Sequence, residues 1–326
     1  MKSKAALLMV LVVVFCAVAF GQAQAPQAPA TDSVAPNIPG VVAAGTKIQV
    51  VKDGFEGTEG PVAMSDGSVV FNGGSRLMKI DKDNNVSVFM ENPNGANGLA
   101  FDSKGRLIAV LTAAGKTGIG VLYPKGSETV LIDRVDGKPF GRPNDLVVDQ
   151  KGGVYFTDPG PNAQQIAAGL TATTPAVYHL APGGKLSKIA EGIERPNGIQ
   201  LSPDEKTLYV NNTQGEYLLA FDIQPDGTVR NRRNFAKYEG VTKSATGAAS
   251  GADGLAVDSA GRVYTAANGG VQVFSPAGQH LGTMPVPRGV QNLAFAGADK
   301  KTLYLVGRGV AYKVQTQAQG FKGRAK

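Results

Sequence analysis

Apolar and polar residues alternate in short runs along most of this chain, and the same arrangement returns six times. Each copy begins with a polar residue, continues with an apolar run, makes a tight turn and ends in a second apolar run. Alternation with a period of two is typical of β-strands, and the short turn predicts an antiparallel pair. The copies are EGPVAMSDGSVVFN from Glu59, NGLAFDSKGRLIAV from Asn97, NDLVVDQKGGVYFTD from Asn144, NGIQLSPDEKTLYVNN from Asn197, DGLAVDSAGRVYTAA from Asp253 and QNLAFAGADKKTLYLV from Gln291.

The six copies share one register. In four of them the turn glycine lies eight positions after the first polar residue, as from Asn97 to Gly105. In the other two copies Lys206 and Lys300 take the glycine position, and the turn gains one residue. A shared register indicates repeats of one structural unit.

A third apolar run, and often a fourth, follows each pair, as in GVLYP and TVLID after the second copy. Four strands in a repeat of roughly 40 to 55 residues are typical of a propeller blade. We therefore predict an all-β fold, a six-bladed β-propeller with four-stranded antiparallel blades. The last copy is one strand short, so KIQVVKD (47–53) is expected to supply the missing outer strand and close the ring. A pair of β-sandwiches is the alternative, but it does not predict six copies in one register.

The N-terminus is typical of an export signal. Lys2 and Lys4 precede an apolar run at 5–20 and then small residues, so residues 1–25 are predicted to be a cleaved signal peptide. The protein would then be periplasmic or secreted, without a stable membrane span after cleavage. An uncleaved anchor is the alternative. Residues 26–46 are rich in Pro and Ala and predict a linker, residues 47–316 form the propeller, and residues 317–326 form a basic tail.

Composition excludes several kinds of site. The 326 residues include one cysteine, Cys16, and two histidines, His179 and His280, which argues against disulfide frameworks, Cys/His zinc sites and haem attachment. Both histidines fall in outer strand or hairpin positions, where a structural role is expected. The net charge of +7 is spread along the chain without a dense basic stripe, so no nucleic-acid partner is predicted.

The first residue of every copy carries a side-chain oxygen. The shared register places these residues at the start of the innermost strands, beside the central channel. Two carboxylates and four amides in one small space are costly unless a cation compensates them. Calcium takes roughly six to eight oxygen ligands, so Ca²⁺ is the expected ion, with Mg²⁺, Mn²⁺ and Zn²⁺ as alternatives. The structural alternative is that Asn and Asp are common turn residues, although Glu59 is a poor turn former. The six residues are Glu59, Asn97, Asn144, Asn197, Asp253 and Gln291.

Several motifs resemble those of a known family, the SMP-30/gluconolactonase/LRE-like family of six-bladed propellers. The resemblance runs from about Glu56 to Tyr312 and implies a single divalent cation, usually calcium, on the propeller axis, and no organic cofactor. The motifs are TEGP (58–61), GRPND (141–145), YFTDP (155–159), RPNG (195–198), ADGLAVD (252–258) and AFAGADKKTLYL (294–305).

The resemblance also implies roles for individual residues. Glu59, Asn197 and Asp253 match the core metal ligands, and Asp253 matches the catalytic proton acceptor and donor. Asn144 matches a fourth ligand or substrate contact, and Arg142 a substrate-binding arginine.

Three further residues are assigned from their positions. Asn97 and Gln291 have no counterpart as ligands and are expected to line the channel. Asp158 follows a second strand and is expected to border the pocket.

Two long loops, 159–176 and 239–252, are expected to build the mouth of the site. In animal gluconolactonases a glutamate that helps to bind sugar lactones follows the second strand of the third blade. This chain reads PGPNAQQ there, without an acidic residue. The departure weakens the expectation of a sugar lactone more than that of a metal site.

The expected function is that of an exported, metal-dependent lactonase, with a small lactone or ester as substrate and a monomeric state. One alternative is a hydrolase of other small esters or phosphotriesters. Another is a non-catalytic, calcium-stabilised propeller that binds a protein or glycan, because one fold hosts many functions.

Overall fold

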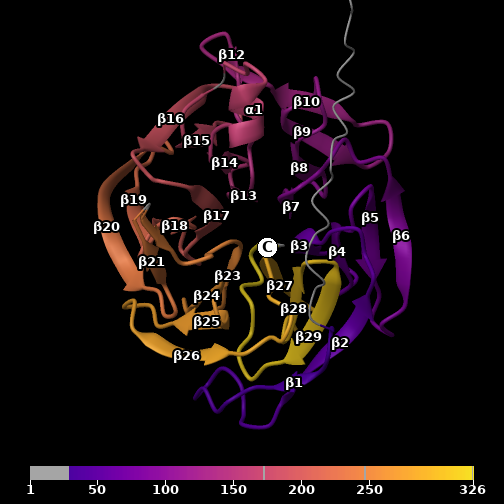
Figure 1. The fold of residues 1–326 in the computed structure, drawn as a ribbon. Coiled ribbons are helices and arrows are strands. Elements are labelled where there is room, and N and C mark those ends of the chain that lie inside the picture. Colours follow the sequence, from indigo (N-terminus) through magenta and orange to yellow (C-terminus); the bar gives the residue numbers. More distant parts are fainter. Residues whose placement is uncertain (1–28, 172, 246, 325) are drawn as a thin grey trace, which may run out of the picture.

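The computed structural model describes residues 29–171, 173–245, 247–324 and 326, and its sheets surround one axis as the six blades of a propeller (Figure 1). All blades are antiparallel and four-stranded, as the repeats predict, and the sixth carries one additional strand. The predicted signal peptide, 1–25, lies outside the described residues. Within the described ranges, no helix is long and apolar enough to cross a membrane.

In blades 1 to 5 the strands follow one another outward from the axis in chain order, and only the outer strands of blade 6 come from the N-terminal segment. Blade 1 contains β3 (Glu59–Ala63), β4 (Val69–Asn72), β5 (Arg76–Ile80) and β6 (Val86–Glu91). Blade 2 contains β7 (Leu99–Phe101), β8 (Leu107–Leu111), β9 (Gly118–Tyr123) and β10 (Thr129–Ile132). Blade 3 contains β13 (Leu146–Val148), β14 (Val154–Asp158), β15 (Ala176–Leu180) and β16 (Leu186–Glu191).

The second half of the ring follows the same plan. Blade 4 contains β17 (Pro196–Leu201), β18 (Thr207–Asn212), β19 (Tyr217–Ile223) and β20 (Val229–Lys237). Blade 5 contains β23 (Leu255–Val257), β24 (Val263–Ala267), β25 (Gly270–Phe274) and β26 (His280–Met284). Blade 6 contains β27 (Asn292–Ala296), β28 (Thr302–Gly307), β29 (Val310–Gln315) and β2 (Lys47–Asp53), to which β1 (Ser33–Val34) is added.

The short elements lie in loops within blade 3 and between neighbouring blades. Helix α1 (Ala163–Ala167) lies in the predicted loop 159–176, and the hairpin of β21 (Thr242–Ser244) and β22 (Gly247–Ala249) lies in 239–252. A second hairpin, β11 (Arg134–Val135) with β12 (Lys138–Pro139), precedes blade 3.

The core lies between the blades, because each sheet packs its two faces against two neighbours. Between blades 1 and 6, for example, Val69 and Phe71 pack with Tyr304 and Val306. All of β8 is buried for the same reason, which explains why its sequence LIAVL is apolar throughout. The innermost strands contact one another around the ring and bring the starts of all six blades to the axis.

The predicted closing strand is confirmed. β2 pairs antiparallel with β29, with Ile48 opposite Val314, and the Ile48 side chain is fully buried. The N-terminal segment thus completes the blade that ends the chain, and β29 is paired on both sides, by β28 and β2.

The structure differs from the predicted linker at its second half. Ile38, Val41 and Val42 are buried in the core of blades 5 and 6, and Val42 donates its N–H to the carbonyl of Ile38 in a tight turn. These apolar residues show no period because they lie in a turn rather than in a helix or strand. Folded structure therefore begins before Lys47.

The structure also differs from the predicted tail. After β29, Gly320 bridges to Asp258, and Arg324 bonds to the carbonyls of Leu201 and Ser202. These partners lie at the turns between first and second strands, so residues 317–324 cross the end of the propeller where these turns lie. The last residue reaches the axis (Figure 1).

One turn differs from the predicted register. Gly67, Gly105, Gly152 and Gly261 all have positive φ, as expected. In blade 4, however, the residue with positive φ is Glu205 rather than Lys206. Glu205 lies eight residues after Asn197, so this turn keeps the common spacing.

Candidate functional site

The first residues of all six repeats line one pocket of about 320 Å³. It lies where the innermost strands begin, at the end of the axis opposite the C-terminal segment. The sequence-predicted set is therefore brought together from six separate blades, and four other residues complete the wall. The pocket residues are Glu59, Asn97, Asn144, Asn197, Asp253 and Gln291, with Thr112, Arg142, Pro143 and Arg195.

Glycines let the innermost strands approach closely enough to form this pocket. A Cβ on Gly198 would lie 2.1 Å from the carbonyl oxygen of Asp253, and the Gly198 N–H donates to that same oxygen at 3.0 Å. Gly98 donates in the same way to the carbonyl of Asn144 at 3.0 Å. The glycine after the polar residue is thus needed for packing, while the polar residue supplies an oxygen to the pocket.

A hydrogen-bond chain determines which atom of Asn197 faces the pocket. The Thr213 hydroxyl donates to the carbonyl of Ala252 at 2.7 Å, so its oxygen accepts from the side-chain nitrogen of Asn197 at 3.0 Å. The Asn197 amide nitrogen is therefore engaged, and its oxygen is presented to the pocket.

Three buried oxygens in the pocket have no hydrogen-bond partner among the described residues. They are Oδ1 of Asn144, Asn197 and Asp253, from blades 3, 4 and 5. Glu59, which is 8% exposed, adds a carboxylate from blade 1, and one of its oxygens accepts the Gly60 N–H. A buried acceptor without a donor is costly, and a cation removes that cost. The set of two carboxylates and two amide oxygens suits a hard cation such as Ca²⁺. In the described part of the chain there is no cluster of three or more His, Cys, Asp or Glu side chains that could hold a metal, because half of this candidate set is amide.

The electrostatics of the site also fit a missing positive charge. Burial and the nearby Asp145 carboxylate raise the pKa of Asp253 to about 7, although Arg195 and Arg308 act in the opposite direction. Burial, followed by the charges of Asp253 and Asp145, raises the pKa of Glu59 well above its usual range. Without a cation, these carboxyl groups favour the protonated state.

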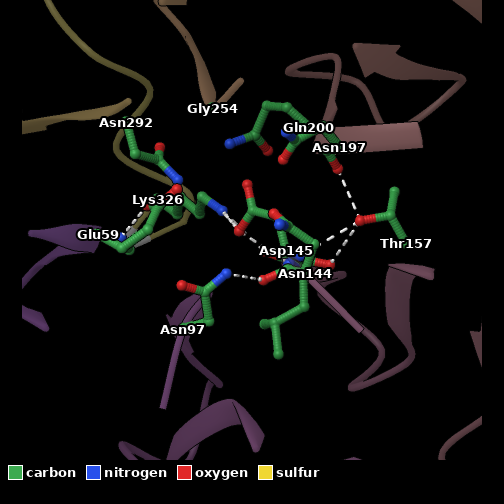
Figure 2. A network of polar contacts seen from close by, with 12 residues as sticks. Glu59, Asn97, Asn144, Asp145, Thr157, Asn197, Gln200, Gly254, Asn292 and Lys326 are labelled. Atoms are coloured by element: carbon green, nitrogen blue, oxygen red, sulfur yellow. Dashed lines mark hydrogen bonds and ion pairs between the residues drawn. The ribbon is translucent and has the colours of Figure 1, made fainter. Parts of the chain in front are cut away.

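A buried ion pair lies beside the candidate ligands (Figure 2). The ammonium of Lys326 donates to Asp145 and to the carbonyl of Leu146, and the side chains of Lys326 and Asp145 are each 1% exposed. Lys326 reaches the axis within the segment that crosses the far end of the propeller. Asp145 follows Asn144 in the chain but does not itself line the pocket, and Lys326 is its ion-pair partner.

Asp158 does not line the pocket as expected; it holds the loop that carries Arg142. Its carboxylate accepts the N–H groups of Gly141 and Arg142, each at 2.8 Å, and of Gly160 at 2.9 Å, and it also accepts the hydroxyl of Thr173. The side chain is fully buried. All of its acceptor capacity is thus used by its own loops.

The pocket contains a second arginine that was not predicted. Arg195 is half-buried. Its backbone N–H donates to the side-chain oxygen of Asn212 at 3.1 Å, and its carbonyl accepts the backbone N–H of Thr213 at 3.1 Å. A signal was present in the sequence, since the tripeptide RPN occurs at 142–144 and again at 195–197. Arg195 therefore occupies in blade 4 the position of Arg142 in blade 3.

The remaining predicted residues have clear positions. Asn97 and Gln291 both line the pocket. The Asn97 side-chain nitrogen donates to the Asn144 carbonyl at 3.0 Å, and the Gln291 side-chain oxygen accepts the Arg308 backbone N–H at 2.9 Å. His179 is buried in β15 against Tyr155, and burial lowers its pKa; His280 is exposed on β26. Neither histidine lines the pocket.

Both long loops lie at the pocket end. Gln165 of α1 donates to the Gly141 carbonyl at 3.3 Å, beside the Arg142 loop. Ser250, after the β21–β22 hairpin, bonds to the carbonyls of Asn212 and Thr213.

Comparison with known proteins places this architecture in a family. A sequence profile of the SMP-30/gluconolactonase/LRE-like region matches residues 57–307. The chain belongs to this family. A gluconolactonase of Zymomonas mobilis is 28% identical, over 87% of this chain and 85% of the relative. A gluconolactonase structure from Xanthomonas campestris has a TM-score of 0.74 at 27% identity and covers 89% of this chain and 98% of its own. A calcium-binding regucalcin from Agrobacterium tumefaciens shares the fold with a TM-score of 0.68 at 19% identity, over 85% of this chain and 98% of its own.

Proposed function

We propose that this protein is an exported, divalent-metal-dependent hydrolase that opens a small lactone. The three buried oxygens without partners, from Asn144, Asn197 and Asp253, carry the proposal, because they meet Glu59 in one pocket open to small molecules. Its relatives from Zymomonas mobilis and Xanthomonas campestris are named gluconolactonases, which supports lactone chemistry. The calcium-binding regucalcin supports Ca²⁺ as the ion.

The residues that would hold the cation are Glu59, Asn144, Asn197 and Asp253. Two carboxylates would balance the two positive charges, and the amides would complete the protein ligands. The chemistry that a bound divalent cation supplies is polarisation of an ester carbonyl and a lower pKa for water.

Asp253 is the residue proposed to move the proton. Its carboxylate accepts a proton from the attacking water as the new C–O bond forms at the lactone carbonyl. It returns this proton to the ring oxygen when the acyl–oxygen bond breaks, which leaves a hydroxy acid. A carboxylate held beside the reacting carbonyl can accept and return a proton in this way. Arg142 would orient the substrate above it.

Hydrolysis of a lactone panel by the purified protein tests this proposal. We expect activity to disappear after chelation and to return with Ca²⁺, with Mg²⁺, Mn²⁺ and Zn²⁺ as parallel additions. Asp253→Ala should lower kcat/KM by about 10²- to 10⁴-fold. Asp226→Ala, at an exposed turn between β19 and β20, is the matched control.

Three outcomes would change the assignment. Activity that is unaffected by chelation would exclude the metal role. Hydrolysis of aryl esters or phosphotriesters, but of no lactone, would support the other hydrolase. A protein that binds Ca²⁺ and hydrolyses nothing would support a non-catalytic propeller.

Export is a separate part of the proposal. It rests on Lys2 and Lys4 before the apolar run of the N-terminus. Fractionation of the producing cells and intact-mass measurement should find the protein outside the cytoplasm without its first 19 to 25 residues. A full-length cytoplasmic protein would contradict it.

A further inference from the structure

We propose that Arg142 and Arg195 form an anion clamp at the mouth of the pocket and that the substrate is a lactone carrying an oxyanion, a carboxylate or a phosphate. This inference rests on the proposed lactonase function and names its substrate class.

The two arginines are equivalent residues of neighbouring blades, and both are held from their backbones. The Arg142 N–H is bound by Asp158 at 2.8 Å, and the Arg195 N–H by Asn212 at 3.1 Å. Their guanidinium groups line the same pocket. The Nε atoms of both are buried, and neither has a hydrogen-bond partner within the described part of the chain. Each of these two arginines thus lines the pocket and has a buried Nε donor without an acceptor among the described residues.

Nearby carboxylates do not supply the missing partner. Asp158 is saturated by its own loops, and Asp145 pairs with Lys326. Glu194, beside Arg195, accepts from the side chain of Asn212. No ion pair joins either pocket arginine to an acidic side chain of the described residues.

The charges of the pocket lead to the same conclusion. With a divalent cation bound, Glu59 and Asp253 would be ionised and would balance its two positive charges. Arg142 and Arg195 would then leave the pocket with an excess of two positive charges. A neutral lactone would leave this excess uncompensated, whereas an anionic lactone reduces it.

Holding the two guanidiniums together has a cost. Arg142 and Arg195 line the same small pocket, so their like charges repel each other. An anion between the groups removes this repulsion, and the planar guanidinium matches carboxylate and phosphate oxygens in a paired geometry. A volume of about 320 Å³ admits a ligand of this size.

The test compares kcat/KM for three lactones that share one ring: a neutral aldonolactone, its carboxylate-bearing counterpart and its phosphorylated counterpart. We expect the holoenzyme to prefer at least one charged substrate. Arg195→Gln and Arg142→Gln should each lower the ratio of charged to neutral kcat/KM by about 10- to 100-fold, mainly through KM. Arg195→Lys should restore part of the ratio, because it keeps the charge but not the paired geometry.

Arg230→Gln, on the exposed face of β20, is the matched control and should keep the wild-type ratio. The charged substrate that is preferred identifies the oxyanion. A wild-type preference for the neutral lactone, or a ratio that neither pocket substitution changes, would overturn the clamp.

A binding measurement separates this inference from the proposed function. Calorimetric titration of the Ca²⁺-loaded protein with the open-chain dicarboxylate and the open-chain phosphorylated acid requires no turnover. If either acid binds at least tenfold more weakly to Arg195→Gln and no lactone is hydrolysed, the clamp is retained and the lactonase is rejected. Lactone hydrolysis without arginine-dependent anion binding would retain the lactonase and reject the clamp.

Discussion

At the scale of single residues, the site depends on which atom each side chain presents. Asn197 could turn either its nitrogen or its oxygen toward the axis. The bond from the Thr213 hydroxyl to the Ala252 carbonyl leaves the Thr213 oxygen as an acceptor, so the Asn197 nitrogen must point there. Thr213, which is not one of the proposed ligands, therefore determines that Asn197 presents its side-chain oxygen to the pocket.

Thr213→Val tests this selection. The Asn197 amide would lose its acceptor and could rotate, so we expect Ca²⁺ affinity to fall by about 10- to 100-fold, as for other residues that orient metal ligands. Calcium titration by calorimetry measures the change. Thr129→Val, at an exposed position of β10, is the control, and equal affinity in both variants would contradict the role of Thr213.

The raised pKa values predict how pH affects the metal-free protein. Asp253, with a folded pKa of about 7, keeps a proton that the unfolded chain releases above about pH 4. The folded state thus binds more protons in this range, and stability should fall as pH rises from about 4 to 7, with Glu59 acting in the same direction.

Thermal unfolding between pH 5 and pH 8 measures this dependence. With chelator, the midpoint should decrease toward pH 8, and the increase caused by added Ca²⁺ should grow with pH because protons and the cation compete. Asp253→Asn should flatten the chelator curve. A metal-free midpoint that rises over this interval would contradict the prediction.

At the scale of elements, the loop before β13 is organised from the end of β14. Asp158 collects three backbone N–H groups and one hydroxyl and so fixes the position of Arg142 relative to Asn144. The motif YFTDP identifies the aspartate but does not show which groups its side chain contacts. In the structure its carboxylate binds the neighbouring loops and does not line the pocket.

Asp158→Asn tests this positioning role. Replacing one carboxylate oxygen by a donor should remove two of its bonds, destabilise the protein by about 2 kcal/mol and reduce kcat/KM. The ratio of kcat/KM for the charged lactone to that for the neutral lactone should also fall, as in Arg142→Gln. A purely structural role of Asp158 would not change this ratio. Asp81→Asn, at a surface turn with similar N–H bonds, is the control and should keep the wild-type ratio.

At the scale of the whole molecule, two terminal segments complete the ring. β2 supplies the outer strand of blade 6, and residues 317–324 cross the end of the axis from blade 6 to blade 4. Lys326 then pairs with Asp145, 181 positions away in the sequence. At this end of the axis, the buried ammonium of Lys326 therefore pairs with the buried carboxylate of Asp145.

Lys326→Met should leave Asp145 buried without a partner. We expect a loss of about 3–5 kcal/mol in the free energy of unfolding at neutral pH, measured by urea denaturation with chelator present. Asp145→Asn in the same chain should recover part of the loss. Lys322→Met, an exposed residue of the same segment, is the control, and similar losses in both lysine variants would show that the ion pair contributes little.

The sequence by itself determined the parts of this protein that repeat. Alternation reports which strand faces are buried, and a constant spacing from Asn97, Asn144 and Asp253 to their turn glycines reports equivalent positions. These two signals predict six blades and the closing strand. They also predict that six oxygen-bearing residues meet on one axis, because equivalent positions of neighbouring blades lie next to each other in a ring.

Only the tertiary structure decided the parts that do not repeat. The direction of Asp158, the acceptor role of Thr213 and the pairing of Lys326 with Asp145 depend on groups brought together from distant segments. Ile38 and Val42 pack in a turn without period. A local pattern reports the surroundings of its own strand, whereas hydrogen bonds and charge pairs between segments are determined when the chain folds back on itself.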